Sequence, residues 1–381
     1  MENTIIAQRQ EKADALRANQ LDPYTNSFKV THEAAALHAE FDDAAEETLA
    51  ADPVRVSIAG RVRAVRKFGK VAFIALDCRT GKMQATIFVK KLDETALTAF
   101  TNLDVGDIVG IDGRVMITRK GELSIETTML TILTKALRPL PEKWHGLSDV
   151  ATRYRQRYVD LIVNEDVRNV FKMRSKIVQF IRGFLDKRDY LEVETPMLQP
   201  IYGGASARPF KTHHNTMDME LFMRVAPELN LKRLVVGGLH RVYEMNRCFR
   251  NEGVSTQHNP EFTMLEFYQA FATYEDLMDL TETMLSELCI HLHGTEEITF
   301  DGKPLSFKAP FRRLSVYDGL VEYAGVAPED IHDRAALLVA AERLGIKKAA
   351  DLGLGYLQME VFETAAEPQM WHPTFVVDFP T

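Results

Sequence analysis

Alternation of apolar and polar residues between positions 54 and 126 constrains the fold of this chain more than any other feature. The alternating runs are 54–62, 72–77, 83–88, 107–115 and 123–126, with turn signals at 79–82 and 120–121. Because successive side chains of a strand point to opposite faces, each run predicts a strand with one buried face. Five short strands of this kind predict a small closed barrel of the oligonucleotide-binding type.

The charge of the barrel segment differs in sign from the rest of the chain. Residues 54–143 hold 16 Lys and Arg against 9 Asp and Glu, whereas residues 1–53 hold 4 against 11 and residues 144–381 hold 26 against 34. A basic barrel on an acidic chain favours nucleic-acid binding, because phosphate contacts supply much of the affinity for nucleic acids. A basic face that is only solvated is the alternative, and charge alone does not exclude it.

Composition on either side of the barrel predicts the domain organisation. The segments 2–18 and 31–50 are rich in Ala and charged residues and predict helices that pack on the barrel. Two prolines within 137–143 disfavour both a helix and a central strand, so we place a domain boundary there. The expected parts are a helical extension (1–53), the barrel (54–143) and a larger second domain (144–381).

Features that would place the chain in a membrane or an oxidising compartment are missing from the sequence. No apolar run approaches membrane-spanning length, and the charged N-terminal region lacks the apolar core of a signal peptide. The three cysteines are odd in number and lack metal-ligand spacing. We therefore expect a cytoplasmic protein without a membrane partner, whose thiols have no catalytic role.

A strand–loop–strand pattern over residues 243–268 concentrates the polar chemistry of the second domain. Strand parity places Arg250 with Glu244 on one face, and Phe262, Glu266 and Tyr268 on one face of the returning strand. An arginine, carboxylates and an aromatic ring are the groups that hold a nucleoside triphosphate beside a charged small molecule. The alternative is an amphipathic hairpin whose charged face is only solvated.

The same segment carries a family resemblance. Residues 250–253 (Arg-Asn-Glu-Gly) with 258–263 (His-Asn-Pro-Glu-Phe-Thr) resemble motif 2 of the class II aminoacyl-tRNA synthetases, and 264–268 (Met-Leu-Glu-Phe-Tyr) resemble the lysine-specific branch. Residues 190–196 resemble motif 1, and 203–210 resemble the segment that follows it in the lysine enzymes. The likeness runs from about Leu21 to the last residue. It implies an α+β fold in which the barrel precedes an antiparallel-sheet catalytic domain.

The resemblance implies an ATP-dependent activation of L-lysine, followed by its transfer to tRNA(Lys), with Mg²⁺ as a cofactor. Arg250 is then the catalytic residue, because its fork-shaped cation suits both the α-phosphate and the amino-acid carboxylate. Glu252 accepts the adenine amino group and Phe262 stacks on the purine. His258 and Asn259 reach the outer phosphates.

The resemblance also assigns the groups that bind lysine. The α-amino group goes to the Gly204 backbone and Glu228, and Arg250 binds the carboxylate. Glu266 and Tyr268 bind the side-chain ammonium, which needs anionic and hydroxyl partners when it is buried.

On the barrel, Phe73, Gln84 and Arg66 match positions that contact the anticodon in similar lysine enzymes. A core position for Phe73 stays equally open, because parity does not say which face of its strand is exposed. The apolar stripe over 167–185 predicts a long helix. By analogy this helix and Pro196 form the interface of a homodimer, and core packing is the alternative.

The resembling enzymes continue past the position of Thr381. Their further stretch carries the metal-binding carboxylates, so we expect no metal ligand within this chain, and it carries motif 3 with an arginine for the terminal phosphate. We therefore expect an incomplete catalytic domain and slow formation of lysyl-adenylate. Three interpretations follow: a truncated lysine–tRNA ligase, a non-catalytic tRNA-binding paralogue, or a ligase-like enzyme that attaches an amino acid to a protein.

Overall fold

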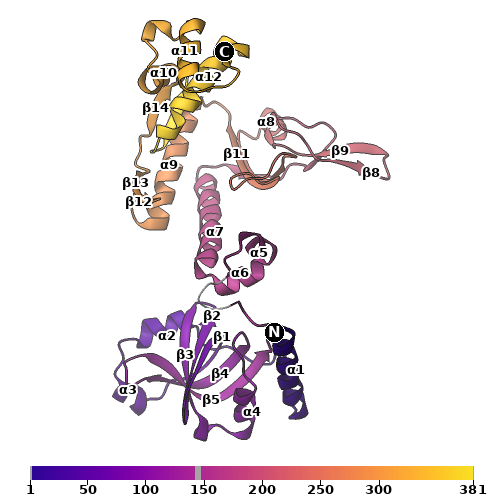
Figure 1. Cartoon of the computed structure of the whole chain (residues 1–381), viewed down its shortest axis with the longest axis vertical. Coiled ribbons are helices and arrows are strands. Elements are labelled where there is room, and N and C mark those ends of the chain that lie inside the picture. The colour runs from indigo at the N-terminus through magenta and orange to yellow at the C-terminus, as the bar shows by residue number, and fades with distance from the viewer. Residues whose placement is uncertain (1, 142–146, 381) are drawn as a thin grey trace. The chain divides into compact units, whose positions relative to one another are not determined.

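The computed structural model describes residues 2–141 and 147–380, and it divides into two compact units, Met1–Arg168 and Asn169–Thr381 (Figure 1). The boundary predicted at residue 143 lies outside the described residues. The helices of the first unit are α1 (Glu2–Ala18), α2 (Ala34–Phe41), α3 (Glu46–Ala51), α4 (Glu94–Thr101), α5 (Val150–Arg155) and α6 (Arg157–Val163), with a 3₁₀ turn η1 (Val89–Lys91). Helix α7 (Glu165–Asp186) begins in the first unit and continues into the second.

A closed five-stranded barrel dominates the first unit, as the alternation predicts. Its strands are β1 (Arg55–Phe68), β2 (Val71–Cys78), β3 (Gly81–Phe88), β4 (Ile108–Ile117) and β5 (Leu123–Thr134), in the order β1-β2-β3-β5-β4. Ile58, Ile74, Ile87, Ile111 and Ile125 are almost fully buried in its core. At Gly113 a Cβ atom would lie 2.2 Å from the Glu126 carbonyl oxygen, so the glycine allows β4 to approach β5 closely.

The N-terminal helices pack on the barrel, and one of them differs from the prediction. Leu16, Leu37 and Leu49, from α1, α2 and α3, join the barrel core. The helix predicted over residues 31–50 is two helices, because α2 ends at Phe41 and α3 begins only at Glu46. Asp42 and Asp43 follow α2, and aspartate has a low helix propensity because its side chain favours caps and turns.

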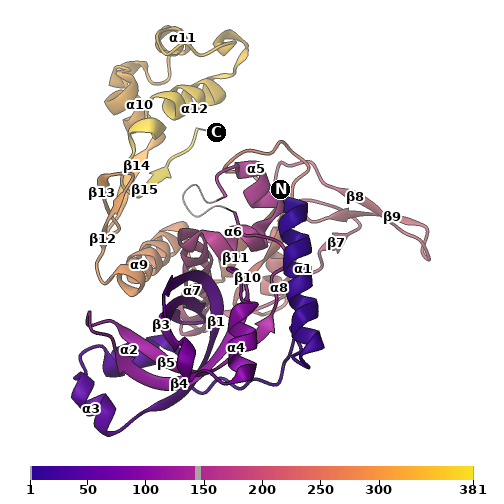
Figure 2. The ribbon, with the colours of Figure 1, turned by 60° about the horizontal axis from the view of Figure 1, so that its bottom comes forward.

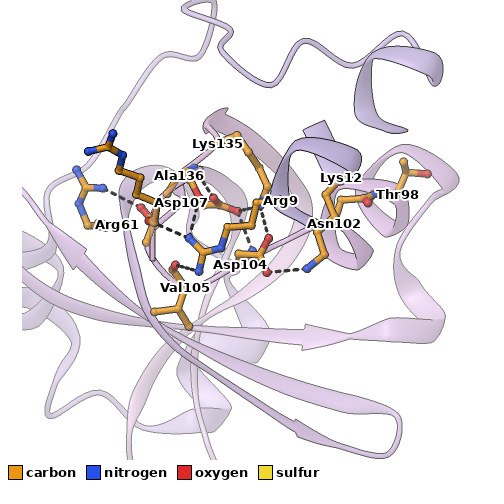
Figure 3. Close-up of polar contacts among 12 residues, drawn as sticks. Arg9, Lys12, Arg61, Thr98, Asn102, Asp104, Val105, Asp107, Lys135 and Ala136 are labelled. Atoms are coloured by element: carbon orange, nitrogen blue, oxygen red, sulfur yellow. Dashed lines mark hydrogen bonds and ion pairs between the residues drawn. The ribbon is translucent and has the colours of Figure 1, made fainter. Parts of the chain in front are cut away.

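A buried ion-pair network fastens α1 to the end of the barrel (Figure 3). The Lys135 ammonium is fully buried and lies 2.6 Å from Asp104 and 2.7 Å from Asp107. From α1, Lys12 pairs with Asp104 at 2.6 Å, and the Arg9 guanidinium donates to the carbonyl oxygens of residues 105, 136 and 138. Each buried charge therefore has an opposite charge or hydrogen-bond partner, as burial requires.

The second unit contains two three-stranded sheets that position the candidate site. Its strands are β6 (Leu191–Glu192), β7 (Leu198–Gln199), β8 (Lys211–His214), β9 (Met219–Met223), β10 (Arg241–Phe249), β11 (Glu261–Gln269), β12 (Glu297–Phe300), β13 (Lys303–Ser306), β14 (Arg312–Ser315) and β15 (Thr374–Val377). One sheet has the order β11-β10-β6 and the other β7-β9-β8. The long antiparallel hairpin β10–β11 is the strand–loop–strand unit predicted from the sequence.

Two two-stranded sheets, β12–β13 and β14–β15, complete the strands of the second unit, and its remaining elements are helices. They are α8 (Glu228–Val236), α9 (Tyr274–His293), α10 (Val316–Ala324), α11 (Arg334–Arg343) and α12 (Leu354–Ala365), with 3₁₀ turns η2 (Pro328–Asp330), η3 (Ala349–Asp351) and η4 (Glu367–Gln369). Helices α10, α11 and α12 share a separate core around Leu320, Leu337 and Phe362, and Figure 2 shows these helices grouped beyond β14 and β15. Within the described residues, none of these helices has the length and apolar character needed to span a bilayer.

Candidate functional site

The register of the β10–β11 hairpin brings the predicted polar side chains to one face. Glu244 pairs with Glu266 and Cys248 pairs with Phe262, and the Arg250 N–H donates to the Pro260 carbonyl at 2.9 Å. Directly opposed residues of an antiparallel pair project to the same side. Arg250, Phe262 and Glu266 therefore share a face with Tyr268, which lies two residues beyond Glu266.

Arg250 and Phe262 form one end of this face. The guanidinium carbon of Arg250 lies 5.2 Å from the centroid of the Phe262 ring, within cation–π range. The Arg250 Nε atom is buried and has no hydrogen-bond partner among the described residues. Arg247, in contrast, is exposed and lies 3.5 Å from Glu261. Of these two arginines, Arg250 is therefore the one that remains available to a buried anion.

The loop between the two strands is exposed, and its predicted ligand groups make local contacts. The Ser255 hydroxyl and the His258 Nδ1 atom are hydrogen-bonded at 2.9 Å. The Asn259 side-chain amide donates to the Glu261 carbonyl at 2.5 Å. Glu252 is exposed next to Arg250 in the chain. All three predicted nucleotide-binding residues thus belong to the loop that follows Arg250.

Gly204 lies against Glu228, the first residue of α8. The glycine has a φ of +89°, and a Cβ atom on it would lie 3.0 Å from the Glu228 Cβ and 3.2 Å from the Ala226 Cβ. A side chain at this position is therefore disfavoured by the backbone conformation, and its Cβ contacts would be tight. The Glu228 carboxylate pairs with Lys232 at 2.6 Å on the next turn of α8. The structure brings the predicted α-amino ligands together.

Glu266 and Tyr268 are half-buried and joined to each other. The Tyr268 hydroxyl donates to Glu266 Oε2 at 3.1 Å. Burial raises the pKa of Glu266, and the Tyr268 hydrogen bond lowers it. The negative charges of Glu228 and Glu244 raise it further, whereas Arg224 lowers it. Burial and the adjacent Glu266 carboxylate raise the pKa of Tyr268, so its hydroxyl stays a donor.

The sequence reasoning missed a buried group beneath this face, Arg224 with Thr195. The Arg224 guanidinium is fully buried and donates to Glu244 Oε1 at 2.6 Å and to Thr195 Oγ1 at 3.1 Å. The Thr195 hydroxyl in turn donates to Glu244 Oε2 at 2.7 Å. The available signal was an isolated arginine within the run Met223-Arg224-Val225-Ala226, because a lone charge among apolar residues needs a buried partner.

The predicted anticodon residues lie on the outer face of the barrel. Ala72, Ile74 and Leu76 of β2 fill the core, so Phe73 faces outward and is half-buried. Arg66 pairs with Phe73 across β1 and β2, and Gln84 pairs with Ala75 across β2 and β3. The Gln84 Nε2 atom is buried without a hydrogen-bond partner among the described residues. An aromatic ring, a cation and an unsatisfied amide thus share one surface.

This surface has two further members. The Phe68 ring is 64% exposed and contacts the Phe73 ring edge-on, with 6.0 Å between the ring centroids. Glu126 of β5 is held by Lys91 and Arg114, both at 2.7 Å. Burial alone would raise the pKa of Glu126, but these two cations lower it. The surface therefore combines aromatic rings with charges that are fixed by ion pairs.

A metal site made of protein side chains is not found in the described part of the chain. No group of three or more His, Cys, Asp or Glu residues there is arranged to hold an ion. Among the described residues, therefore, no cluster of side chains could hold Mg²⁺ without further ligands.

The fold and the site define the class of protein. Residues 149–381 match the family described as tRNA synthetases class II (D, K and N), and residues 56–133 match the OB-fold nucleic acid binding domain. The chain is therefore a class II aminoacyl-tRNA synthetase with an OB-fold domain of the anticodon-binding type.

Relatives at high identity identify the branch. The lysine–tRNA ligase of Thioalkalivibrio sulfidiphilus is 48% identical over 381 residues, which are 100% of this chain and 76% of that protein. The lysine–tRNA ligase of Idiomarina loihiensis is 50% identical over 380 residues, covering 99% of this chain and 75% of that protein. The lysine–tRNA ligase of Xanthomonas campestris pv. campestris is 50% identical over 383 residues, covering 100% of this chain and 75% of that protein. The chain belongs to the lysine–tRNA ligase family.

Proposed function

We propose that this chain binds L-lysine and ATP on the β10–β11 face for the formation of lysyl-adenylate, and tRNA(Lys) on the barrel. The observation that carries the proposal is the state of the three carboxylates at this face. Glu244 is 1% exposed and accepts hydrogen bonds from Arg224 and from Thr195. Glu228 is paired with Lys232. Glu266 accepts from the neutral Tyr268 and has no salt bridge to any described residue.

This difference among the carboxylates supports recognition of a lysine ammonium. A buried ammonium is stable only beside an anion with which it can form hydrogen bonds. Glu266 supplies the negative charge, and the Tyr268 oxygen supplies a second acceptor at the same point. An uncharged aliphatic amino acid would leave Glu266 half-buried and unpaired, so the same geometry disfavours it.

The opposite end of the face suits the nucleotide. Arg250 has an unpartnered buried Nε and a guanidinium next to Phe262. A fixed cation here would attract both the lysine carboxylate and the α-phosphate, which otherwise repel each other. The carboxylate oxygen would then attack the α-phosphorus, a new P–O bond would form, and the bond to pyrophosphate would break. Phe262 offers its ring to the adenine, Glu252 can accept from the adenine amino group, and the loop residues His258 and Asn259 lie near the outer phosphates.

The α-amino group of lysine is assigned to Glu228 and the Gly204 backbone. The absence of a side chain at Gly204 keeps open the space beside the Glu228 carboxylate, which a Cβ atom would approach to 3.6 Å from Oε2. Any Mg²⁺ would enter with the nucleotide phosphates, which are its usual ligands in such sites.

The barrel face is assigned to the anticodon of tRNA(Lys). Phe73 offers a ring for base stacking, the Gln84 amide is an unused donor, and Arg66 provides charge beside them. Base–aromatic stacking over a basic surface is the usual mode of single-strand binding by this barrel type.

The proposal also includes a homodimer in the cytoplasm. Val170 of α7 is 66% exposed and Phe171 is 45% exposed, and Pro196 is exposed as well. An apolar stripe on a long helix with these exposures supports an interface with a second copy. Sedimentation equilibrium on the chain and on a Val170→Asp variant tests the homodimer, and a wild-type monomer at micromolar concentration would contradict it.

The cytoplasmic location agrees with the state of the cysteines. Cys78, Cys248 and Cys289 are free thiols, as a reducing compartment requires.

Lysine-dependent exchange of pyrophosphate into ATP tests the proposed reaction, with the Idiomarina loihiensis relative measured in parallel. Exchange within about tenfold of that relative, a barrier difference of ~1.4 kcal/mol, would mean that the chain supports the chemistry by itself. Absence of exchange with retained lysine and RNA binding would favour the non-catalytic tRNA-binding alternative. Absence of lysine binding would refute the assignment of Glu266 and Tyr268.

A further inference from the structure

Arg224 occupies an unusual position for a charged side chain. It lies between β9 and α8, and its guanidinium is fully buried. Besides its contacts with Glu244 and Thr195, it donates from Nε to the Arg247 carbonyl at 2.8 Å. Its remaining nitrogen, Nη2, is buried and has no hydrogen-bond partner among the described residues. The charge is therefore held rigidly, and Glu244 and Thr195 do not use all of its hydrogen-bonding capacity.

Glu244 is the other half of this arrangement. Its carboxylate accepts from the Thr195 N–H and hydroxyl, from Arg224, and weakly from the Asn246 amide at 3.4 Å. In the β10–β11 register it stands directly opposite Glu266. Like charges directly opposite each other destabilise a strand pair, and their mutual repulsion drives one of them to take up a proton.

We propose that Arg224 is a positioning residue for lysine recognition: it neutralises Glu244, so that the opposed Glu266 stays ionised and free to bind the lysine ammonium. The proposal rests on the function proposed above and deepens it. Arg224 does not touch lysine in this arrangement, and it acts through the two carboxylates. Its effect would fall on the affinity for lysine and on the pH range over which lysine binds.

Several charged or titratable groups enter this balance, with Arg250 at the far end of the same face. Glu228 approaches from α8, Glu244 and Cys248 from β10, Tyr268 from β11, and Arg224 from the segment before α8. Burial and the two other carboxylates raise the pKa of Glu266, whereas the Tyr268 hydrogen bond and Arg224 lower it. Lys232 pairs with Glu228 on the exposed side of α8, whereas Arg224 is the buried cation that pairs with the Glu244 carboxylate.

The experiment follows the ionisation of Glu266 directly, without lysine. The full chain is labelled with ¹³C at the glutamate side-chain carboxyl carbon, and the Glu266 signal is assigned by its loss in a Glu266→Gln variant. The titration is then compared among the wild type, Arg224→Met, Glu244→Gln and the double variant. Arg233→Met is the matched control, because Arg233 is an exposed arginine on α8.

The proposal predicts opposite shifts for the two single variants. Arg224→Met moves the Glu266 midpoint to higher pH, because the Glu244 charge is then unopposed. Glu244→Gln moves it to lower pH, because the Arg224 charge is then unshared, and the double variant returns towards the wild type. Arg233→Met leaves it unchanged. Should Arg224→Met fail to fold, Glu244→Gln and the double variant still decide the question. A Glu266 midpoint that stays in place in the folded variants would overturn the proposal.

Lysine binding by calorimetry across pH separates this proposal from the function on which it rests. At pH values below the wild-type midpoint, Arg224→Met loses about tenfold in lysine affinity for each pH unit by which its Glu266 midpoint is displaced, and it recovers the wild-type affinity above the displaced midpoint. A loss of affinity that is equal at all pH values would indicate a merely structural role. A wild-type chain that does not bind lysine, with Glu266 shifting as expected, would refute the proposed function and leave the charge relation intact.

Discussion

Replacement of Phe73 by alanine should weaken RNA binding by the barrel while leaving the fold unchanged. The ring lies on the outer face of β2, between the core positions Ala72 and Ile74, so its removal leaves no cavity in the barrel core. Its ring contact is Phe68, with 6.0 Å between the centroids. The substitution therefore removes a stacking surface and little else.

The magnitude follows from what a half-buried ring can offer a base. Stacking of one base on an aromatic side chain contributes about 1–3 kcal/mol to binding, which corresponds to roughly 5-fold to 150-fold in affinity. Phe68 remains in the variant and can retain part of the stacking, so we expect a loss near the lower end, about tenfold. Arg66 is untouched, so the salt dependence set by phosphate contacts should stay the same.

The assay is fluorescence anisotropy with the full chain and an anticodon stem-loop carrying UUU, against the same stem with a scrambled loop, at two salt concentrations. Tyr24→Ala is the control, because Tyr24 is an exposed aromatic outside the β1–β3 face. The reasoning predicts that Phe73→Ala loses affinity for the UUU loop and that Tyr24→Ala does not. Equal losses for both variants, or no loss for either, would refute the stacking role.

Three further outcomes are expected. Arg250→Ala should weaken ATP binding, measured by calorimetry, by about 100-fold, because it removes an unpaired cation. Arg247→Ala should change the ATP affinity little, because the exposed ion pair of Arg247 is worth about 0–1 kcal/mol. Similar losses in both variants would contradict the strand assignment. Tyr268→Phe should reduce lysine affinity by roughly 1.5–3 kcal/mol, since a hydrogen bond to a charged group is lost, and an unchanged dissociation constant would rule out that contact. Lys135→Met should lower the free energy of unfolding in urea by about 3 kcal/mol at pH 7, because it leaves Asp107 buried with only backbone N–H partners. Burial alone would raise the pKa of Asp104, but Lys12 and Lys135 lower it, so the part of the stabilisation that comes from the Asp104–Lys135 pair is present above the unfolded pKa of about 3.9 and is lost as the pH falls through the lower folded value. A difference between Lys135→Met and the wild type that does not shrink below about pH 4 would contradict that account.

The sequence predicted the strands and side-chain faces that follow from the spacing of neighbouring residues. Alternation was sufficient for the five strands of the barrel, because each strand buries one face in a shared core. The alternation of side chains along a strand was likewise sufficient to place Arg250 and Arg247 on opposite faces of the hairpin. It could not decide which way Phe73 points, because that depends on which side of β2 the barrel closes around.

The contacts that the sequence did not predict join segments far apart in the chain. Thr195, Arg224 and Glu244 meet only after β9, β10 and the segment before β7 have packed together. No spacing rule links three such positions. The break between α2 and α3 falls at Asp42 and Asp43, whose low helix propensity is too weak a signal to predict a helix end by itself.

The central claim is that the β10–β11 face selects an amino acid by its ammonium group, and calorimetric binding of L-lysine against L-norleucine tests it most directly. Norleucine has the same aliphatic chain without the ammonium. We predict that the wild-type chain prefers lysine by about tenfold to 100-fold, as expected for hydrogen bonds to a charged group, and that Glu266→Gln loses this preference. Equal affinities in the wild type, or a preference that survives in Glu266→Gln, would contradict the claim.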